Sequence, residues 1–430
     1  MSDAATISED ARPDDGSGSE DERYGLIKEA FQGLVRKCGE MSRHEDRREE
    51  LENPETLSRE EIAARKAVLV ELHTELMPAL KRKLTSLLAA VFLDGSIPTD
   101  NPNPEPLLGE ILEILSDFGP SLDYIRASIV QLAPWTHTHS RMFSHRDQAY
   151  GQLKKFRCDR LVNQFDSSIC INLREIFKSY IRCLEDHLYH SGVSNASWLS
   201  WLGEKSEACC REVEQWIQIA TGSDFRVLQA DWQDDWHSLQ HPLKTLHASL
   251  ELVGKAAGSN RRSPMLLALY HLFTDTERLA ALAVKFYMTV MTSRCLITFP
   301  DNLSTNELEW VFWRTSRLTP FINRMAESLT ELFKREYPMH VEILRTRQDR
   351  DLITRHIRSL KVAAFKLQRS LDAGLALICF HHLPSPVASL NHPPSENLYR
   401  SLFYETRSQW SHVMRKYRNH LRALRRLINP

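Results

Sequence analysis

The chain has 430 residues, enough for two or three domains or for one extended helical array. Its 55 lysines and arginines balance 56 aspartates and glutamates, which excludes a surface built as a whole to hold nucleic acid or anionic lipid. Any electrostatic partner must therefore be bound by a local patch. Only 15 glycines are present, and such a low glycine content disfavours β architectures and favours long helices.

The N-terminal stretch MSDAATISEDARPDDGSGSEDER contains eight acidic residues against Arg12 and Arg23. It offers too little apolar surface to offset the entropy lost on ordering, so residues 1–23 are predicted to be a disordered acidic tail. The stretch also lacks the apolar region of a secretory signal. The eight cysteines form no C-x-x-C pair, which is typical of reduced thiols. We therefore expect an intracellular protein, either cytoplasmic or nuclear.

After the tail, apolar residues recur at helical spacing almost throughout the chain. Helix starts are marked by two capping boxes, Ser58 with Glu61 and Ser304 with Glu307, and by the pair Ser263-Pro264. Gly- and Pro-containing breaks separate the helical stretches. An all-α fold of about ten long helices in antiparallel bundles is predicted. The helices are expected at 24–42, 58–93, 105–133, 146–190, 197–220, 224–256, 263–296, 304–336, 338–382 and 395–428.

Three parts are predicted along the chain. The disordered acidic tail at 1–23 is followed by an N-terminal helical bundle at 24–145. Residues 146–430 are expected to form one or more C-terminal helical bundles. The helix expected at 146–190 is long enough to connect the two bundled parts.

Three stretches carry a family resemblance: QLKKFRCDRL, RRSPMLLALYHLFTDTERLAALAVKFY and LYRSLFYETRSQWSHVMRKY. They resemble an uncharacterised family of all-helical proteins from rust fungi and related basidiomycetes, and the resemblance runs from about residue 70 onward. It implies an all-helical fold. These are helix-packing motifs and the family has no assigned activity, so the resemblance implies no catalytic or binding residues.

Three histidines, His137, His139 and His145, lie in the short stretch WTHTHSRMFSH. They are weak candidates for a metal site, because zinc also needs a fourth ligand in a rigid tetrahedral frame. A His-x-His pair is most convincing on a strand, where alternate side chains share a face. No strand is predicted here, so the stretch is better interpreted as a polar connection between two helices.

The stretch ADWQDDWH places Asp231, Asp234 and Asp235 on one face of a predicted helix. Carboxylates in this arrangement can hold Mg²⁺ against a diphosphate, as in all-helical enzymes of the terpene-cyclase type. The usual order of the acidic motif is reversed here, however, and no second metal-binding motif is present. A solvated acidic face beside Trp232 and Trp236 in the core is the favoured interpretation, and the metal-dependent enzyme is the alternative.

The motifs of nucleotide-binding proteins, serine hydrolases and zinc proteases are missing from the sequence. We therefore expect no cofactor. The favoured hypothesis is a non-enzymatic adaptor or scaffold whose long helices offer grooves to a partner protein.

The last predicted helix combines an apolar stripe with a basic patch, and no acid occurs from residue 406 to the end. The stripe should pack onto the bundle. The patch predicts a weak anionic partner, either anionic lipid, nucleic acid or an acidic protein segment, and the bland alternative is a set of cations that favour the helix dipole. The patch consists of Arg415, Lys416, Arg418, Arg422, Arg425 and Arg426.

Overall fold

The computed structural model describes most of the chain as helix, and no strand occurs in the described ranges. The all-α class is therefore confirmed. Most of the expected acidic tail lies outside the described residues, but residues 20–23 form the first turn of α1 (Glu20–Arg43) and are not part of a tail. The described residues are 20–43, 57–95, 105–132, 147–189, 196–259, 263–292, 303–336, 347–381 and 395–428.

The helices form two compact units, and each unit is built from two stretches of the chain. Unit 1 comprises Met1–Thr138 and Cys158–Thr221, and unit 2 comprises His139–Arg157 and Gly222–Pro430. This division differs from the predicted boundary near residue 146. The reason is that the helices after residue 158 bury their apolar faces against the N-terminal helices of unit 1.

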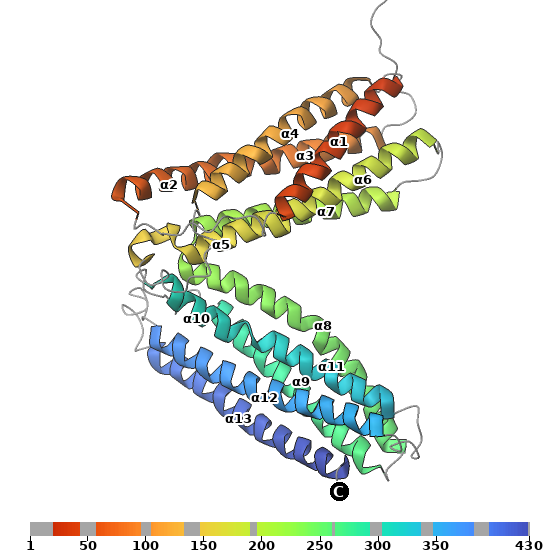
Figure 1. The fold of residues 1–430 in the computed structure, drawn as a ribbon, viewed down its shortest axis with the longest axis vertical. Coiled ribbons are helices and arrows are strands. Elements are labelled where there is room, and N and C mark those ends of the chain that lie inside the picture. Colours follow the sequence, from red (N-terminus) through yellow and green to blue (C-terminus); the bar gives the residue numbers. More distant parts are fainter. Residues whose placement is uncertain are drawn as a thin grey trace, which may run out of the picture. The chain divides into compact units, whose positions relative to one another are not determined.

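Unit 1 is a bundle in which α1 packs against α4 and α6, α3 packs against α4 and α7, and α6 packs against α7 (Figure 1). Aromatic rings fill its centre, where Phe31 stacks on Tyr180 with ring centroids 5.0 Å apart. Phe118 meets Phe177 edge to face at 5.3 Å. Besides α1, the helices are α2 (Arg59–Glu71), α3 (Met77–Gly95), α4 (Glu105–Leu132), α5 (Lys155–Asn163), α6 (Cys170–Tyr189) and α7 (Ala196–Thr221).

Two long helices of the prediction contain π-helical turns. One turn, Leu72–Leu76, joins α2 to α3, and the other, Gln164–Ile169, joins α5 to α6. Pro78 follows the first turn and has no N–H to donate to the carbonyl of Thr74, which accounts for the widened turn. The helix expected from residue 146 also starts later than predicted, because a 3₁₀ helix (Asp147–Leu153) precedes α5.

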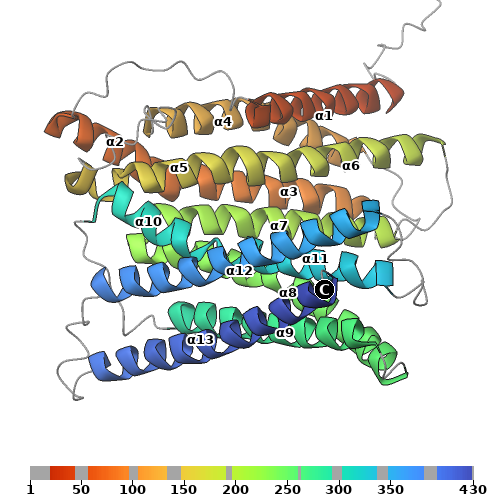
Figure 2. The same cartoon turned by 60° about the horizontal axis from the view of Figure 1, so that its bottom comes forward.

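Unit 2 is organised around α9, which packs against α8, α11 and α13, while α12 packs against α10, α11 and α13 (Figure 2). Trp232 is buried in its core and donates from Nε1 to Thr315 Oγ1 at 2.8 Å. Tyr287 donates to the Thr315 carbonyl at 2.9 Å. The helices are α8 (Asp224–Ser259), α9 (Pro264–Thr292), α10 (Thr305–Thr315), α11 (Leu318–Glu336), α12 (Arg347–His381) and α13 (Ser395–Ile428).

The predicted helix at 304–336 is interrupted between α10 and α11 at Ser316 and Arg317. Pro320, in the first turn of α11, has no N–H for the Ser316 carbonyl, so the chain stops one helix and starts another. The helix expected from residue 338 is described only from Arg347 onward, as α12.

The predicted helix starts are confirmed. In both capping boxes the serine hydroxyl accepts from a backbone N–H and the glutamate accepts from the serine N–H, at Ser58 with Glu61 and at Ser304 with Glu307. Ser263 Oγ likewise accepts from Leu266 N at 3.3 Å at the start of α9.

Candidate functional site

The C-terminal helix α13 packs through its predicted apolar stripe, since every member of the stripe is buried. Its opposite faces carry the basic patch, whose six residues are all exposed. This division follows from the helical repeat, because residues three and four positions apart share a face. The stripe consists of Trp410, Val413, Tyr417, Leu421, Leu424 and Ile428.

Three of the six basic residues lie together in a groove between α12 and α13. The groove has a volume of about 380 Å³. The other three patch residues, Lys416, Arg425 and Arg426, do not line it. We call this groove the arginine end; its lining residues are Gln368, Ser411, Arg415, Arg418, Asn419 and Arg422.

A second groove of about 330 Å³ lies between the same two helices, closer to the start of α13. Its lining is mostly apolar and includes Tyr404, which is 76% exposed. An aromatic side chain so exposed is available to contact a ligand. We call this groove the apolar end; its lining residues are Asp372, Leu375, Ala376, Cys379, Phe403, Tyr404 and Arg407.

A chain of polar contacts joins the two grooves. Gln368 of the arginine end donates from Nε2 to Asp372 Oδ2 at 2.7 Å. Arg407 donates from Nε to the other oxygen of Asp372 at 3.1 Å. Successive lining residues are one, three or four positions apart on each helix, so they follow one face of α12 and one face of α13. We call the two grooves together the α12–α13 furrow.

The arginine end is rich in unneutralised positive charge. Within the described part of the chain no carboxylate pairs with Arg415, Arg418 or Arg422. Arg422 makes one long contact, from Nη1 to Asn419 Oδ1 at 3.4 Å. Asp372 forms a salt bridge with Arg407 in the apolar end, so the arginine end differs from the apolar end in lacking an acidic partner for its arginines.

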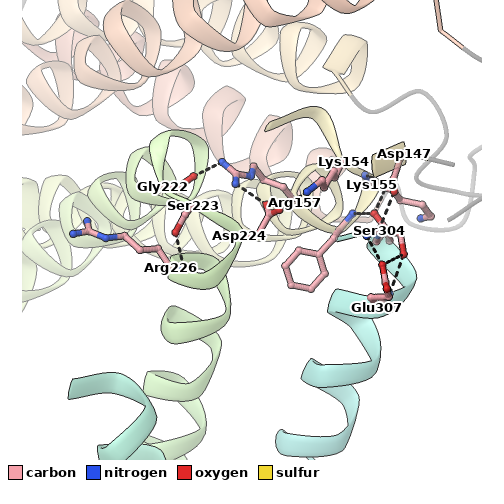
Figure 3. A network of polar contacts seen from close by, with 12 residues as sticks. Asp147, Lys154, Lys155, Arg157, Gly222, Ser223, Asp224, Arg226, Ser304 and Glu307 are labelled. Atoms are coloured by element: carbon pink, nitrogen blue, oxygen red, sulfur yellow. Dashed lines mark hydrogen bonds and ion pairs between the residues drawn. The ribbon is translucent and has the colours of Figure 1, made fainter. Parts of the chain in front are cut away.

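A buried polar network gathers residues at the N-termini of α5, α8 and α10 (Figure 3). Asp224, in the first turn of α8, accepts from Lys154 Nζ at 2.6 Å and from Arg157 Nη2 at 2.7 Å. Arg157 Nη1 also donates to the Gly222 carbonyl at 2.6 Å. Lys154 and Arg157 are only 1% and 2% exposed. Because these charges are buried and paired, the network holds the structure together and is not a candidate ligand site.

Asp147 caps two helices at once in the same network. Its Oδ2 accepts from the Lys155 backbone N–H at 3.0 Å, at the start of α5. Its Oδ1 accepts from the Thr305 N–H at 2.9 Å, at the start of α10, and the Thr305 hydroxyl donates to Oδ2. Gly151 has a φ of 60°, a region that favours glycine, and lets the chain turn between Asp147 and Lys155.

Sequence reasoning missed this network, although it found the neighbouring Ser304–Glu307 capping box. The box is local, whereas Lys154 and Asp224 are 70 positions apart in the sequence and Asp147 and Thr305 are 158 apart. No spacing rule relates such residues before the fold is known. The local signal is the cluster of Lys154, Lys155 and Arg157 at the start of α5.

The three acidic candidates on α8 lie in different environments. Asp234 is exposed, whereas burial raises the pKa of Asp235 to about 7; the nearby Ser316 hydroxyl opposes the shift and the Asp231 and Asp234 carboxylates add to it. Among the described residues no group of three or more His, Cys, Asp or Glu is arranged to hold a metal ion. The structure adds no support to the magnesium hypothesis, which stays a prediction. The histidines His137, His139 and His145 lie outside the described residues.

A second titratable cluster lies where α9 packs against α13. His420 Nδ1 and Asp275 Oδ2 are 2.8 Å apart, and Asp275 is buried. The His271 ring stacks on the His420 ring at a centroid distance of 4.8 Å. Burial, and next the His420 charge, lower the pKa of His271. The cluster attaches α13 to the bundle through its inward face.

The comparisons with known proteins include a match to a protein-family model. Residues 65–220 match the family model of a domain of unknown function, DUF8723. No curated protein and no solved structure matches the chain. The match fits an uncharacterised protein family and assigns no activity. The α12–α13 furrow lies outside the matched residues. No described helix combines the length and apolar character needed to cross a bilayer.

Proposed function

We propose that the protein is a non-enzymatic helical interaction protein whose α12–α13 furrow binds an acidic segment of a partner protein. The observation that carries this proposal is the polarity of the furrow, with an apolar groove at one end and three arginines at the other. Partner segments that dock between helices are held by apolar anchors, and charge complementarity sets their direction. The furrow offers both on one surface.

The dimensions of the furrow suit a short segment. From Phe403 to Arg422 the rise along α13 is about 28 Å at 1.5 Å per residue. An extended segment of about eight or nine residues covers this length, and a helix needs about 19 residues. Apolar residues of the segment would contact Leu375 and Tyr404, and its acidic residues would reach the arginine end.

Nucleic acid and membrane surfaces fit the furrow less well. Asp372 lines the apolar end and is paired with Arg407, so the unpaired cations are confined to one end of the furrow, whereas a phosphodiester backbone needs cations along its whole length. A flat anionic membrane is best met by cations on an open surface, whereas Arg415, Arg418 and Arg422 line a groove between two helices. A protein segment with acids at one end avoids both conflicts.

The proposal places the protein inside the cell. Its support is the set of unbridged cysteines among the described residues, of which Cys38, Cys158, Cys170 and Cys209 are buried. Burial raises the pKa of the Cys38 thiol to about 12, which keeps that thiol protonated and unreactive. Membership of the rust-fungal family is part of the same proposal and rests on the three resembling stretches.

A random library of displayed peptides, each about 20 residues long to match the furrow, tests the proposal when it is selected on the full chain. We expect selected peptides to combine apolar residues with an acidic cluster. Their binding should be lost with Ala376→Glu at the apolar end and with Arg415→Glu combined with Arg418→Glu at the arginine end. The matched control is Arg425→Glu with Arg426→Glu, which makes the same charge change on the same helix outside the furrow and should leave binding intact.

Cys379 supplies a direct reporter of occupancy, because its exposed thiol lines the apolar end. A bound peptide should slow alkylation of Cys379, measured by mass spectrometry, and should leave the half-buried Cys210 of α7 unaffected. Peptides without acidic residues, or binding that survives both furrow variants, would contradict the proposal.

A further inference from the structure

The arginine end holds three like charges close together. Arg415 and Arg418 are three positions apart on α13, and Arg418 and Arg422 are four apart, so all three are neighbours on one helical face. Like charges at these spacings destabilise a helix unless an anion lies between them. No described carboxylate takes that place, which leaves the cluster without its counter-charge.

The donor set of this groove suits a phosphoryl group better than a carboxylate. One carboxylate has two oxygens and is matched by a single guanidinium in a bidentate pair. A phosphoryl group carries about two negative charges and three acceptor oxygens, so it can satisfy several guanidinium groups at once. Ser411 and Asn419 of α13 and Gln368 of α12 add neutral donors around the same space.

The size and position of the groove agree with such a ligand. About 380 Å³ lies at the lower end of the range for small-molecule sites, and it is enough for a phosphorylated side chain with part of its backbone. The apolar end adjoins it through Gln368, Asp372 and Arg407. A segment held by apolar side chains at one end would thus present a phosphorylated residue to the three arginines.

We infer that Arg415, Arg418 and Arg422, together with Gln368, Ser411 and Asn419, form a phosphate-binding site that takes a phosphoserine or phosphothreonine of the partner segment. This inference rests on the proposed function, since it names the chemistry of the segment that the furrow binds. If the segment carries a phosphorylated residue, binding to the furrow depends on phosphorylation of the partner.

Two versions of one selected acidic peptide test the inference. One version keeps its acidic cluster, and in the other a single glutamate is replaced by phosphoserine. Binding to the full chain is measured by fluorescence anisotropy at matched ionic strength. We expect the phosphoserine version to bind about tenfold more tightly or better, and inorganic phosphate to compete with it more effectively than acetate does.

The variant Arg418→Lys separates phosphate recognition from simple charge, because lysine keeps the positive charge and loses the bidentate geometry. It should remove most of the preference for phosphoserine, while Arg425→Lys should keep it. Both positions are exposed, so circular dichroism should show unchanged helicity.

The outcomes separate the two proposals. If the acidic peptide binds in the furrow and phosphoserine adds no affinity, the phosphate site is overturned and the proposed function stands. If inorganic phosphate binds through the three arginines but no peptide is selected, the proposed function is overturned, and the phosphopeptide ligand with it. Arginine-dependent binding of an RNA oligonucleotide or of phosphoinositide vesicles, without binding of phosphoserine peptide, would also overturn the inference.

Discussion

Arg157 donates to Asp224 at 2.7 Å, and both side chains are buried. Arg157 is the last residue of unit 2 before the chain enters unit 1 at Cys158, and Asp224 follows closely after the chain returns at Gly222. One guanidinium thus joins two segments of unit 2 that are separated in the sequence by residues 158–221 of unit 1. Lys154 shares the same carboxylate at 2.6 Å.

Replacing Asp224 by Asn should destabilise unit 2 by about 3–5 kcal/mol, because it leaves two buried cations without a full counter-charge. Urea unfolding followed by circular dichroism measures the change. The matched control is Glu331→Gln, which removes the exposed pair with Lys334 and should cost less than about 1 kcal/mol. Equal effects of the two substitutions would show that the buried network does not stabilise unit 2.

Replacing Asp147 by Ala should weaken two helix starts together, since one carboxylate accepts from backbone N–H groups at Lys155 and Thr305. We expect a loss of about 2–3 kcal/mol, against about 1 kcal/mol for the single cap removed by Ser263→Ala. Hydrogen–deuterium exchange should rise in the first turns of both α5 and α10. A rise in only one of them would contradict the double cap.

Gly374 of α12 faces the core, and a Cβ added there would lie 3.1 Å from Thr315 Cγ2. Thr315 has little freedom to move, because its hydroxyl accepts from Trp232 Nε1. Gly374→Ala should therefore destabilise the protein by about 1–2 kcal/mol, although alanine favours the helix by about 1 kcal/mol. In α1, Gly33→Ala meets no atom within 4 Å and should stabilise. Calorimetry measures the melting temperatures. A higher melting temperature for both variants than for the parent protein would contradict the close contact at Gly374.

The raised pKa of Asp235 predicts that the free energy of unfolding depends on pH. Its pKa is raised from 3.8 to about 7 by burial, so the folded state binds more protons than the unfolded state between these values. The group therefore lowers stability progressively as pH rises from about 4 to about 7, and its penalty stays constant above that range. Asp235→Asn removes the ionisation, so its stabilising effect should be larger at pH 8 than at pH 5 by on the order of 2 kcal/mol. Equal effects at both pH values would contradict the raised pKa.

The positions of most helices follow from the sequence because their causes are local. Ser58, Ser263 and Ser304 mark three starts, and the apolar stripe of α13 predicts which face is buried. Pro78 and Pro320 lie inside the predicted helices 58–93 and 304–336, but a proline does not by itself locate a π-turn or a new helix, because Pro120 and Pro242 lie inside α4 and α8, which continue past them.

The candidate site was predictable only in part. The six cations of α13 are visible in the sequence as a basic patch. Which three of them line the groove depends on α12, which forms the other wall with Gln368. The apolar end depends on the same pairing of helices, because Leu375 and Tyr404 belong to different helices. Long-range helix pairing is not recorded in the spacing of residues along one helix.

The two-stretch construction of unit 1 has a consequence for how its boundaries are drawn. The family match at 65–220 omits α1, whose Phe31 stacks on Tyr180. It also includes Lys154 and Arg157, whose carboxylate partner Asp224 lies beyond its end. A recombinant fragment cut at these limits would expose an aromatic face and would leave two cations without their carboxylate partner. We expect such a fragment to aggregate. We therefore expect the stretch that must be expressed together to fold to be longer than the stretch that the family model matches.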